Sequence, residues 1–329
     1  MKYLKILLVV AVGISFASCS SDDLDSTSIF DTSSPVRNAF DKWLLTNYVT
    51  PYNIDFKYQY SDKESDNQYN LVPADSAKSV ALAIMMKHIW LDSYTELMAA
   101  DFLKSYSPRV MQLIGSPAYS SKEELVLGTA EGGIKITLYN VNAIDINNPY
   151  IDSTSPFVDK TAGTQDLNFW YFHTMHHEFC HIMTQKKNYP TDFKLVSSGK
   201  YKTTDWINLD DKDAPALGFV SGYASSEYNE DFAEIFSIYV THTQDAWNKI
   251  LNAGIVPKMD ENGKDTIKVV KNGVPTVVYD YSGAEAIQKK LEYVKSYMSA
   301  SWNLDLDKLR EIVLRRSGEV GTLDLKNLK

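Results

Sequence analysis

The stretch WYFHTMHHEFCHIM, residues 170–183, contains four of the six histidines in this 329-residue chain. Within it, HEFCH at residues 177–181 is an H-E-x-x-H pattern. Residues four apart lie on the same face of a helix, so the imidazoles of His177 and His181 can reach one ion. Glu178 can then contact a water molecule held by that ion. The alternative is a histidine-rich helix that carries a common five-residue pattern by chance.

A third ligand must come from elsewhere, because a catalytic zinc ion takes three protein ligands and keeps one position open for water. One class of H-E-x-x-H enzymes uses a histidine six residues after the second, but Lys187 occupies that position and excludes the class. Another class takes a glutamate from a later helix. Glu230 and Glu234 fit this role, because two acids beside an apolar stripe are costly unless they are paired or ligating.

We therefore expect His177, His181 and Glu230 to bind one Zn²⁺ ion. Glu234 would accept a hydrogen bond from a ligand histidine and orient its ring. Glu178 would act as the general base of a metal-assisted hydrolysis. The alternative for the second helix is an ordinary amphipathic helix whose acids face water.

The N-terminus reads as a targeting segment rather than as part of the fold. A basic start and a short apolar run end in small residues before Cys19, in the order of a bacterial lipobox. We expect residues 1–18 to be a lipoprotein signal peptide and Cys19 to be acylated; the alternative is an ordinary signal peptide with a chance cysteine. Residues 19–34 are polar and read as a flexible tether. Acidic residues after Cys19 resemble a surface-export signal, although a solvated linker would look the same.

Composition limits the possible functions. The net charge of -9 argues against a nucleic-acid partner, which usually needs a basic face. With Cys19 acylated, Cys180 is the one remaining cysteine, so no intrachain disulfide can form and the fold must rely on its core.

Periodicity along the chain predicts an α+β fold. We expect a catalytic domain over residues 35–252 and a C-terminal subdomain over residues 253–329 that packs on it. Predicted helices cover residues 35–52, 75–99, 165–186, 227–252, 283–300 and 305–316, and residues 187–222 are predicted to be irregular. Predicted strands cover 53–60, 109–115 and 132–141, and residues 266–280 are predicted to be a hairpin that turns at Asn272-Gly273. The strand at 132–141 is the candidate upper edge of a substrate cleft.

The two motifs and the lipoprotein-type start resemble the zinc-binding metallopeptidase lipoproteins of gut commensal bacteria. The spacing of the motifs is also similar to that of anthrax toxin lethal factor, and the resemblance covers the region between them and residues 255–329 only loosely. It implies a zincin-like fold with a small mixed sheet, an active-site helix, a glutamate helix and a mostly helical C-terminal part. In that group a tyrosine seven residues before the ligand glutamate stabilises the oxyanion, and Tyr223 stands at this position.

Several other polar residues are interpreted without a catalytic role. His173 stands one turn before His177 and could lie near the site, but we interpret it as a packing or surface histidine. His176 points elsewhere on the helix, and Cys180 is interpreted as a small apolar filler. The acidic run at residues 210–213 could be an ion site, but a solvated loop explains it as well.

The function expected from these features is a zinc-dependent endopeptidase anchored in the outer membrane and exposed at the cell surface. Its partners would be a peptide or protein substrate and the membrane, reached through Cys19, with the chain as a monomer. One alternative is a zinc-containing surface lipoprotein that binds glycans or partner proteins. Another is a structural lipoprotein with bound zinc. The intact Glu178 favours the enzyme, because a binding protein has no need of a general base.

Overall fold

The computed structural model describes residues 36–61, 65–66, 68–98, 100–120, 125–131, 133–157, 163–263 and 265–329. The predicted signal peptide, Cys19 and the tether lie outside the described residues. The chain divides into two units, Met1–Asn38 and Ala39–Lys329, and every element below belongs to the second. Among the described residues, no helix combines the length and apolar character that a membrane crossing requires.

A small mixed sheet forms the β part of the fold. Its strands are β1 (Asp55–Lys57), β2 (Val110–Leu113), β5 (Gly128–Glu131) and β6 (Lys135–Leu138), in the spatial order β1-β2-β6-β5. The strands β1, β2 and β6 are parallel to one another, and β5 runs antiparallel to β6. The prediction that residues 132–141 form the upper edge of a cleft is therefore wrong, because β6 lies inside the sheet and β5 is the edge strand.

Helices make up most of the rest of the described chain. Before the site lie the near-continuous helices α2–η1–α3 (Ala39–Leu44, Leu45–Val49, Thr50–Tyr52) and α4–η2–α5 (Ser76–Met86, Lys87–Leu91, Asp92–Met98), then α6 (Ala100–Tyr106). Here η1 and η2 are π-helical turns. Short elements follow: the strand pair β3 and β4 (Ala118–Tyr119, Leu125–Val126) and the turns η3, η5, η6, α8 and η7 (Val141–Ala143, Thr191–Leu195, Thr203–Asn208, Ala214–Leu217, Tyr223–Ser225).

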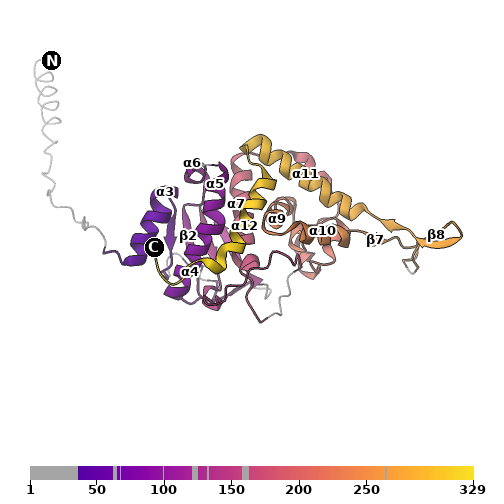
Figure 1. The fold of residues 1–329 in the computed structure, drawn as a ribbon. Helices are drawn as coiled ribbons and strands as arrows, with labels where there is room; N and C mark the ends of the chain where they lie inside the picture. The colour runs from indigo at the N-terminus through magenta and orange to yellow at the C-terminus, as the bar shows by residue number, and fades with distance from the viewer. Residues whose placement is uncertain are drawn as a thin grey trace, which may run out of the picture. The chain divides into compact units, whose positions relative to one another are not determined.

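Two helices carry the histidine and glutamate motifs. The π-helical turn η4 (Asn168–Phe172) leads into α7 (His173–Lys186), and α9 (Tyr228–Thr241) packs against α7. The apolar faces of both helices are buried in the main core, with Phe179 and Met183 on α7 and Phe232 and Phe236 on α9. In Figure 1, α9 is surrounded by α7, α11 and α12, which also contact it. This packing fixes the two motif-bearing faces against each other.

The predicted helix over residues 227–252 is wrong in its middle, where the chain breaks into two helices. α9 ends at Thr241, His242 is extended with φ of -120° and ψ of 152°, and α10 (Gln244–Ala253) begins. The Thr243 side chain caps α10 by accepting from the Ala246 amide, while the Thr243 amide donates to the carbonyl of Ser153. The long-range contact with Ser153 holds the break.

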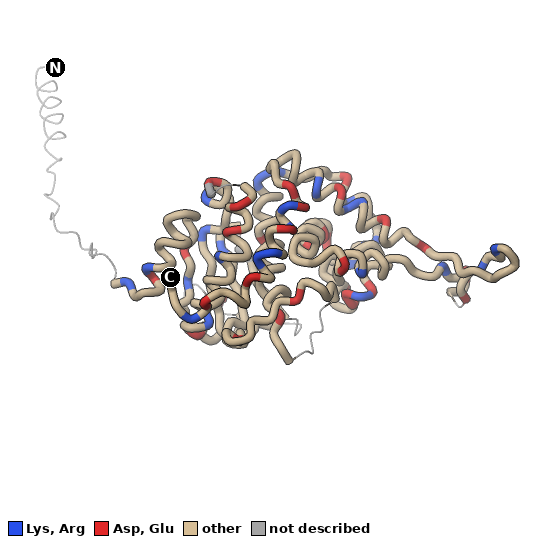
Figure 2. Tube along the Cα trace, viewed as in Figure 1, with Lys and Arg blue, Asp and Glu red and all other residues tan. Residues whose placement is uncertain are grey.

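The C-terminal part contains the predicted hairpin and two helices. The hairpin pairs β8 (Lys268–Lys271) with β9 (Val274–Val277), and Asn272 and Gly273 adopt φ of 50° and 81°, as a tight two-residue turn requires. Below it, β7 (Val256–Pro257) pairs with β10 (Tyr279–Asp280). The chain then forms α11 (Ser282–Trp302), α12 (Leu306–Glu319) and the turn η8 (Val320–Thr322). Figure 2 shows acidic and basic residues interspersed along these helices.

Candidate metal centre

The helix α7 turns two histidines toward a common point. His177 and His181 stand one turn apart, with ring centroids 4.7 Å apart and Nε2 atoms 3.0 Å apart. Both residues are largely covered, since their side chains are 7% and 17% exposed. Phe179 and Cys180, on other sides of the helix, are fully buried in the core. The two rings can therefore reach only the space between α7 and its neighbours.

Glu230, in the first turn of α9, completes the group. Its Oε2 lies 2.9 Å from Nε2 of His177 and 3.2 Å from Nε2 of His181. A tetrahedral zinc ion with bonds of about 2.0–2.2 Å holds its ligand atoms about 3.3 Å apart. The three observed separations are close to this value, and two imidazoles with one carboxylate are a typical donor set for zinc. The residues therefore fit a zinc ion with only small outward shifts.

The electrostatics of this group favour a bound cation. Burial lowers the pKa of His177, but hydrogen bonds to Glu230 and Glu234 outweigh burial and raise it to about 10. Burial also raises the pKa of Glu230, but the two histidines outweigh this effect and hold it well below its usual range. The site thus combines a firmly ionised carboxylate with a proton on His177. A metal ion at the same point would displace that proton, because metal-binding histidines must be neutral.

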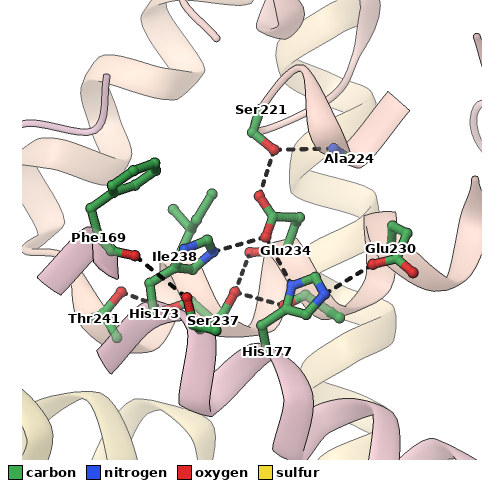
Figure 3. Close-up of polar contacts among 12 residues, drawn as sticks. Phe169, His173, His177, Ser221, Ala224, Glu230, Glu234, Ser237, Ile238 and Thr241 are labelled. Carbon is green, nitrogen blue, oxygen red and sulfur yellow. Dashed lines mark hydrogen bonds and ion pairs between the residues drawn. The ribbon is translucent and has the colours of Figure 1, made fainter. Parts of the chain in front are cut away.

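The three residues His177, His181 and Glu230 are called the ligand group below. Glu234, one turn after Glu230, is buried behind this group (Figure 3). Its Oε1 lies 2.9 Å from Nδ1 of His177 and 2.8 Å from Nε2 of His173, and its Oε2 accepts from the Ser221 hydroxyl at 2.6 Å. With Nδ1 of His177 donating to Glu234, Nε2 is left free to ligate. Burial raises the pKa of Glu234, but His173 and His177 hold it well below its usual range.

A second group of potential ligands, His173, His177 and Glu234, also has its ligand atoms close together. It is the poorer site for an ion, because Glu234 is 3% exposed and its Oε2 is held by the Ser221 hydroxyl. None of the other acidic groups among the described residues forms such a cluster. In the run 210–213, Asp211 accepts a hydrogen bond from the backbone amide of Gly222. This contact connects the run to the residues just before η7.

The ligand group opens onto a cleft of about 750 Å³. Its walls include Glu178, His181 and Glu230, the edge strand at Gly128 and Thr129, the end of α7 and the turn η5. A Cβ atom at Gly128 would lie 2.7 Å from Cγ2 of Thr174, so this glycine allows the edge strand to approach α7 closely. Glu178, the H-E-x-x-H glutamate, is partly exposed on this wall.

Tyr223 lies at the mouth of the same cleft and is 37% exposed. Its ring centroid is 5.9 Å from that of His177 and 4.9 Å from that of Trp206, which packs edge-on against it. The pKa of Tyr223 is raised, first by burial of its hydroxyl and then by the negative charges of Glu230 and Glu234. The phenol is therefore a hydrogen-bond donor at neutral pH.

The remaining residues of the histidine-rich stretch fall into two kinds. His176 is fully buried, contacts the Tyr94 hydroxyl through Nδ1 at 2.9 Å, and has its pKa lowered to about 3 by burial. Cys180 is a buried thiol whose pKa burial raises. His173 differs from our interpretation as a packing or surface histidine, because it bonds Glu234. Its position one turn before His177 was the available signal, and Ser221 had no comparable signal in the sequence.

Two comparisons with known proteins find similar chains. A family model described as "Putative zinc-binding metallo-peptidase" matches residues 33–307. A crystal structure of a putative zinc-binding metallo-peptidase from Bacteroides caccae, at 2.10 Å resolution, is 40% identical and superposes with a TM-score of 0.66. That alignment covers 92% of this chain and all of the other. A search of the curated proteins finds no match. The chain belongs to the family of putative zinc-binding metallo-peptidases.

Proposed function

We propose that this protein is a zinc-dependent endopeptidase with one ion held by His177, His181 and Glu230. The observation that carries the proposal is the convergence of three ligand atoms on the wall of a cleft that also contains Glu178. Membership of a metallo-peptidase family supports the reaction class. The arrangement of active-site helix α7, glutamate helix α9 and a sheet edge beside the cleft supports a zincin-like fold.

Each polar residue of the site has a distinct role in this proposal. When bound, zinc would lower the pKa of a water molecule and polarise the scissile carbonyl. Glu178 takes a proton from the attacking water and later delivers it to the leaving amine. Tyr223 donates a hydrogen bond to the oxyanion that develops on the carbonyl. Glu234 keeps the ring of His177 in the orientation that presents Nε2.

The edge strand β5 supports binding of an extended peptide. Gly128 and Thr129 line the cleft, and β6 is the one strand of the described residues that pairs with β5. An extended substrate can pair with the free edge through its main chain, which holds the scissile bond above the ligand group. Pairing of this kind needs no free terminus, so the enzyme can cleave internal bonds.

The test compares wild-type protein with Glu178→Gln, which keeps the size of the side chain and removes the base. Zinc should stay bound, while cleavage of a broad peptide library should fall by several orders of magnitude; general-base catalysis alone contributes roughly 10²–10⁴-fold. The control is Glu227→Gln, a cleft carboxylate outside the ligand group, which should leave most of the activity. If zinc-loaded wild type cleaves nothing and Glu178→Gln changes nothing, the glycan- or protein-binding alternative replaces this proposal.

We also propose that the mature protein is a monomeric lipoprotein of the outer membrane, exposed at the cell surface through a lipid on Cys19, and that it binds no nucleic acid. The residues that support the anchor lie outside the described part of the chain, so the support is the sequence pattern alone. Cys19→Ala should move the protein from the membrane fraction to the soluble fraction. Retention of this variant in the membrane would reject the anchor.

A further inference from the structure

The carboxylate of Glu234 joins three separate segments of the chain. Oε1 contacts His173 and His177 on α7, and Oε2 accepts from Ser221 in the loop before η7. Glu234 itself belongs to α9, where it is 3% exposed. Figure 3 shows its two oxygens pointing in different directions, one toward the histidines and one toward Ser221. A carboxylate held at both oxygens cannot rotate without breaking a bond on each side.

Ser221 extends the contact toward Tyr223. Its hydroxyl donates to Glu234 and accepts from the backbone amide of Ala224 at 3.1 Å, a combination that a single hydroxyl group permits. Ala224 directly follows Tyr223 in the turn η7. The turn is close-packed, because a Cβ atom at Gly222 would lie 2.2 Å from the Leu209 carbonyl oxygen. A substitution at Ser221 is therefore expected to shift the backbone of the turn that carries Tyr223.

His173 acts on the other oxygen. It does not line the cleft, so it has no contact with a peptide there. Its Nε2 lies 2.8 Å from Glu234, on the same oxygen that contacts His177. Without His173, that oxygen would keep one donor and could turn away from Nδ1 of His177. The ring of His177 would then lose the contact that fixes which nitrogen faces the ion.

We propose that His173 and Ser221 are positioning residues, and that through Glu234 they couple the metal ligand His177 to the turn that carries Tyr223. The part of this proposal that concerns His173 and His177 rests on metal binding alone. The part that concerns Tyr223 rests on the proposed peptidase function, because its kinetic test measures peptide cleavage. A purely structural role predicts something different, namely lower stability with unchanged zinc affinity and unchanged kinetics per folded molecule.

The first experiment measures zinc affinity by competition with a chromophoric chelator. Ser221→Ala and His173→Leu should weaken zinc binding by roughly 10–100-fold, the usual range when a partner behind a ligand is lost. Ser221→Thr keeps the hydroxyl and His173→Gln keeps an N–H donor at a similar reach, so both should restore most of the affinity. The control is Ser237→Ala, a buried serine on α9 whose hydroxyl bonds the backbone carbonyls of Ala233 and Glu234. Wild-type affinity in both test variants would overturn the proposal.

The second experiment follows the Tyr223 turn. In a double-mutant cycle, Tyr223→Phe should lower kcat by about 10²–10³-fold, the usual effect of losing one oxyanion donor. Ser221→Ala should lower kcat with little change in KM, and it should have a much smaller effect when Tyr223 is already Phe. Full additivity of the two substitutions on kcat would overturn the coupling to Tyr223.

A third measurement separates this inference from the peptidase proposal, because it needs no activity. Amide hydrogen exchange of the segment 222–226 should speed up in Ser221→Ala and Glu234→Gln, and it should stay unchanged in Ser237→Ala. Unchanged exchange in both test variants would reject the link between Glu234 and the turn. If wild type cleaves no peptide, the proposed function fails, while zinc affinity and hydrogen exchange still decide the positioning roles.

Discussion

Two neighbouring carboxylates on α9, Asp231 and Glu234, are both buried, but their contacts leave their pKa values shifted in opposite directions. Glu234 is held well below its usual pKa, whereas burial raises the pKa of Asp231 to about 6 against the opposing contacts with Lys290 and Tyr201. They lie three residues apart on one helix and differ in the elements they face. Glu234 points toward the histidines of α7, and Asp231 forms an ion pair with Lys290 of α11.

The number of donors explains the difference. Glu234 has three donors spread over both of its oxygens. Asp231 receives Lys290 at 2.5 Å and the Tyr201 hydroxyl at 2.8 Å on Oδ2, while its Oδ1 has no partner among the described residues. An unsatisfied buried oxygen makes the ionised form costly, and one cation does not compensate for it.

The Lys290 side of this pair is also enclosed. Its ammonium group is fully buried, donates to the Gly218 carbonyl at 2.9 Å and lies 4.1 Å from the centre of the Phe219 ring. Burial lowers its pKa, in spite of Asp231. This pair ties α9, α11 and the loop before η7 together, whereas the Glu230 and Glu234 group faces a cleft. The comparison predicts that one side of α9 governs zinc and chemistry and the other governs stability.

The sharpest test of the comparison uses adjacent residues. Glu230→Gln should weaken zinc binding by more than the roughly 100-fold upper range for a residue behind a ligand, because it removes a ligand atom itself. Asp231→Asn, one residue later, should leave zinc affinity unchanged. Both affinities are measured by chelator competition on folded protein. Equal losses of zinc in the two variants would mean that the two sides of α9 are not separate.

The next prediction concerns stability. Lys290→Met leaves Asp231 as a buried charge with only Tyr201, so unfolding in denaturant at neutral pH should show a loss of about 3–5 kcal/mol. The double variant Asp231→Asn with Lys290→Met removes both charges and should regain most of this loss. Zinc affinity of the folded single variant should stay at the wild-type value. A fall in zinc affinity without a fall in stability would contradict the division between the two sides.

The convergence of His177, His181 and Glu230 could be predicted from the sequence because much of the geometry is local. The spacing of His177 and His181 depends only on the helical repeat, and the acids of α9 were recognisable as costly beside an apolar stripe. The role of His173 was not accessible in the same way, although it stands one turn before His177. Which partner it meets depends on how α7 and α9 pack, and this is set by core residues distant in sequence.

The two errors in the fold have the same origin. Residues 227–252 have continuous helical periodicity, and the break at His242 is held by a contact with Ser153, almost ninety residues earlier, which no local pattern reveals. The edge strand β5 begins with Gly128 and Thr129, and glycine and alanine make weak strand signals. The alternation after residue 133 was correctly identified as a strand, but neighbour order in a sheet is a property of the whole fold.

The smallest expected effect is a pH dependence that separates Asp231 from the glutamates. Because its folded pKa of about 6 lies above the unfolded value near 3.8, Asp231 stabilises the fold below about pH 4, and this contribution disappears as the pH rises through 6. Glu230 and Glu234, with lowered pKa values, act in the opposite direction: their contribution is present above about pH 4.5 and is lost as the pH falls.

The double variant Asp231→Asn with Lys290→Met keeps the glutamates and removes only the first effect. Wild-type stability relative to this variant, measured by denaturant unfolding of zinc-free protein, should therefore fall between pH 4 and pH 6. A difference that stays flat over this interval would show that Lys290 compensates fully for the burial of Asp231, and a rise would show that it more than compensates; in either case the contrast between the two sides of α9 would fail.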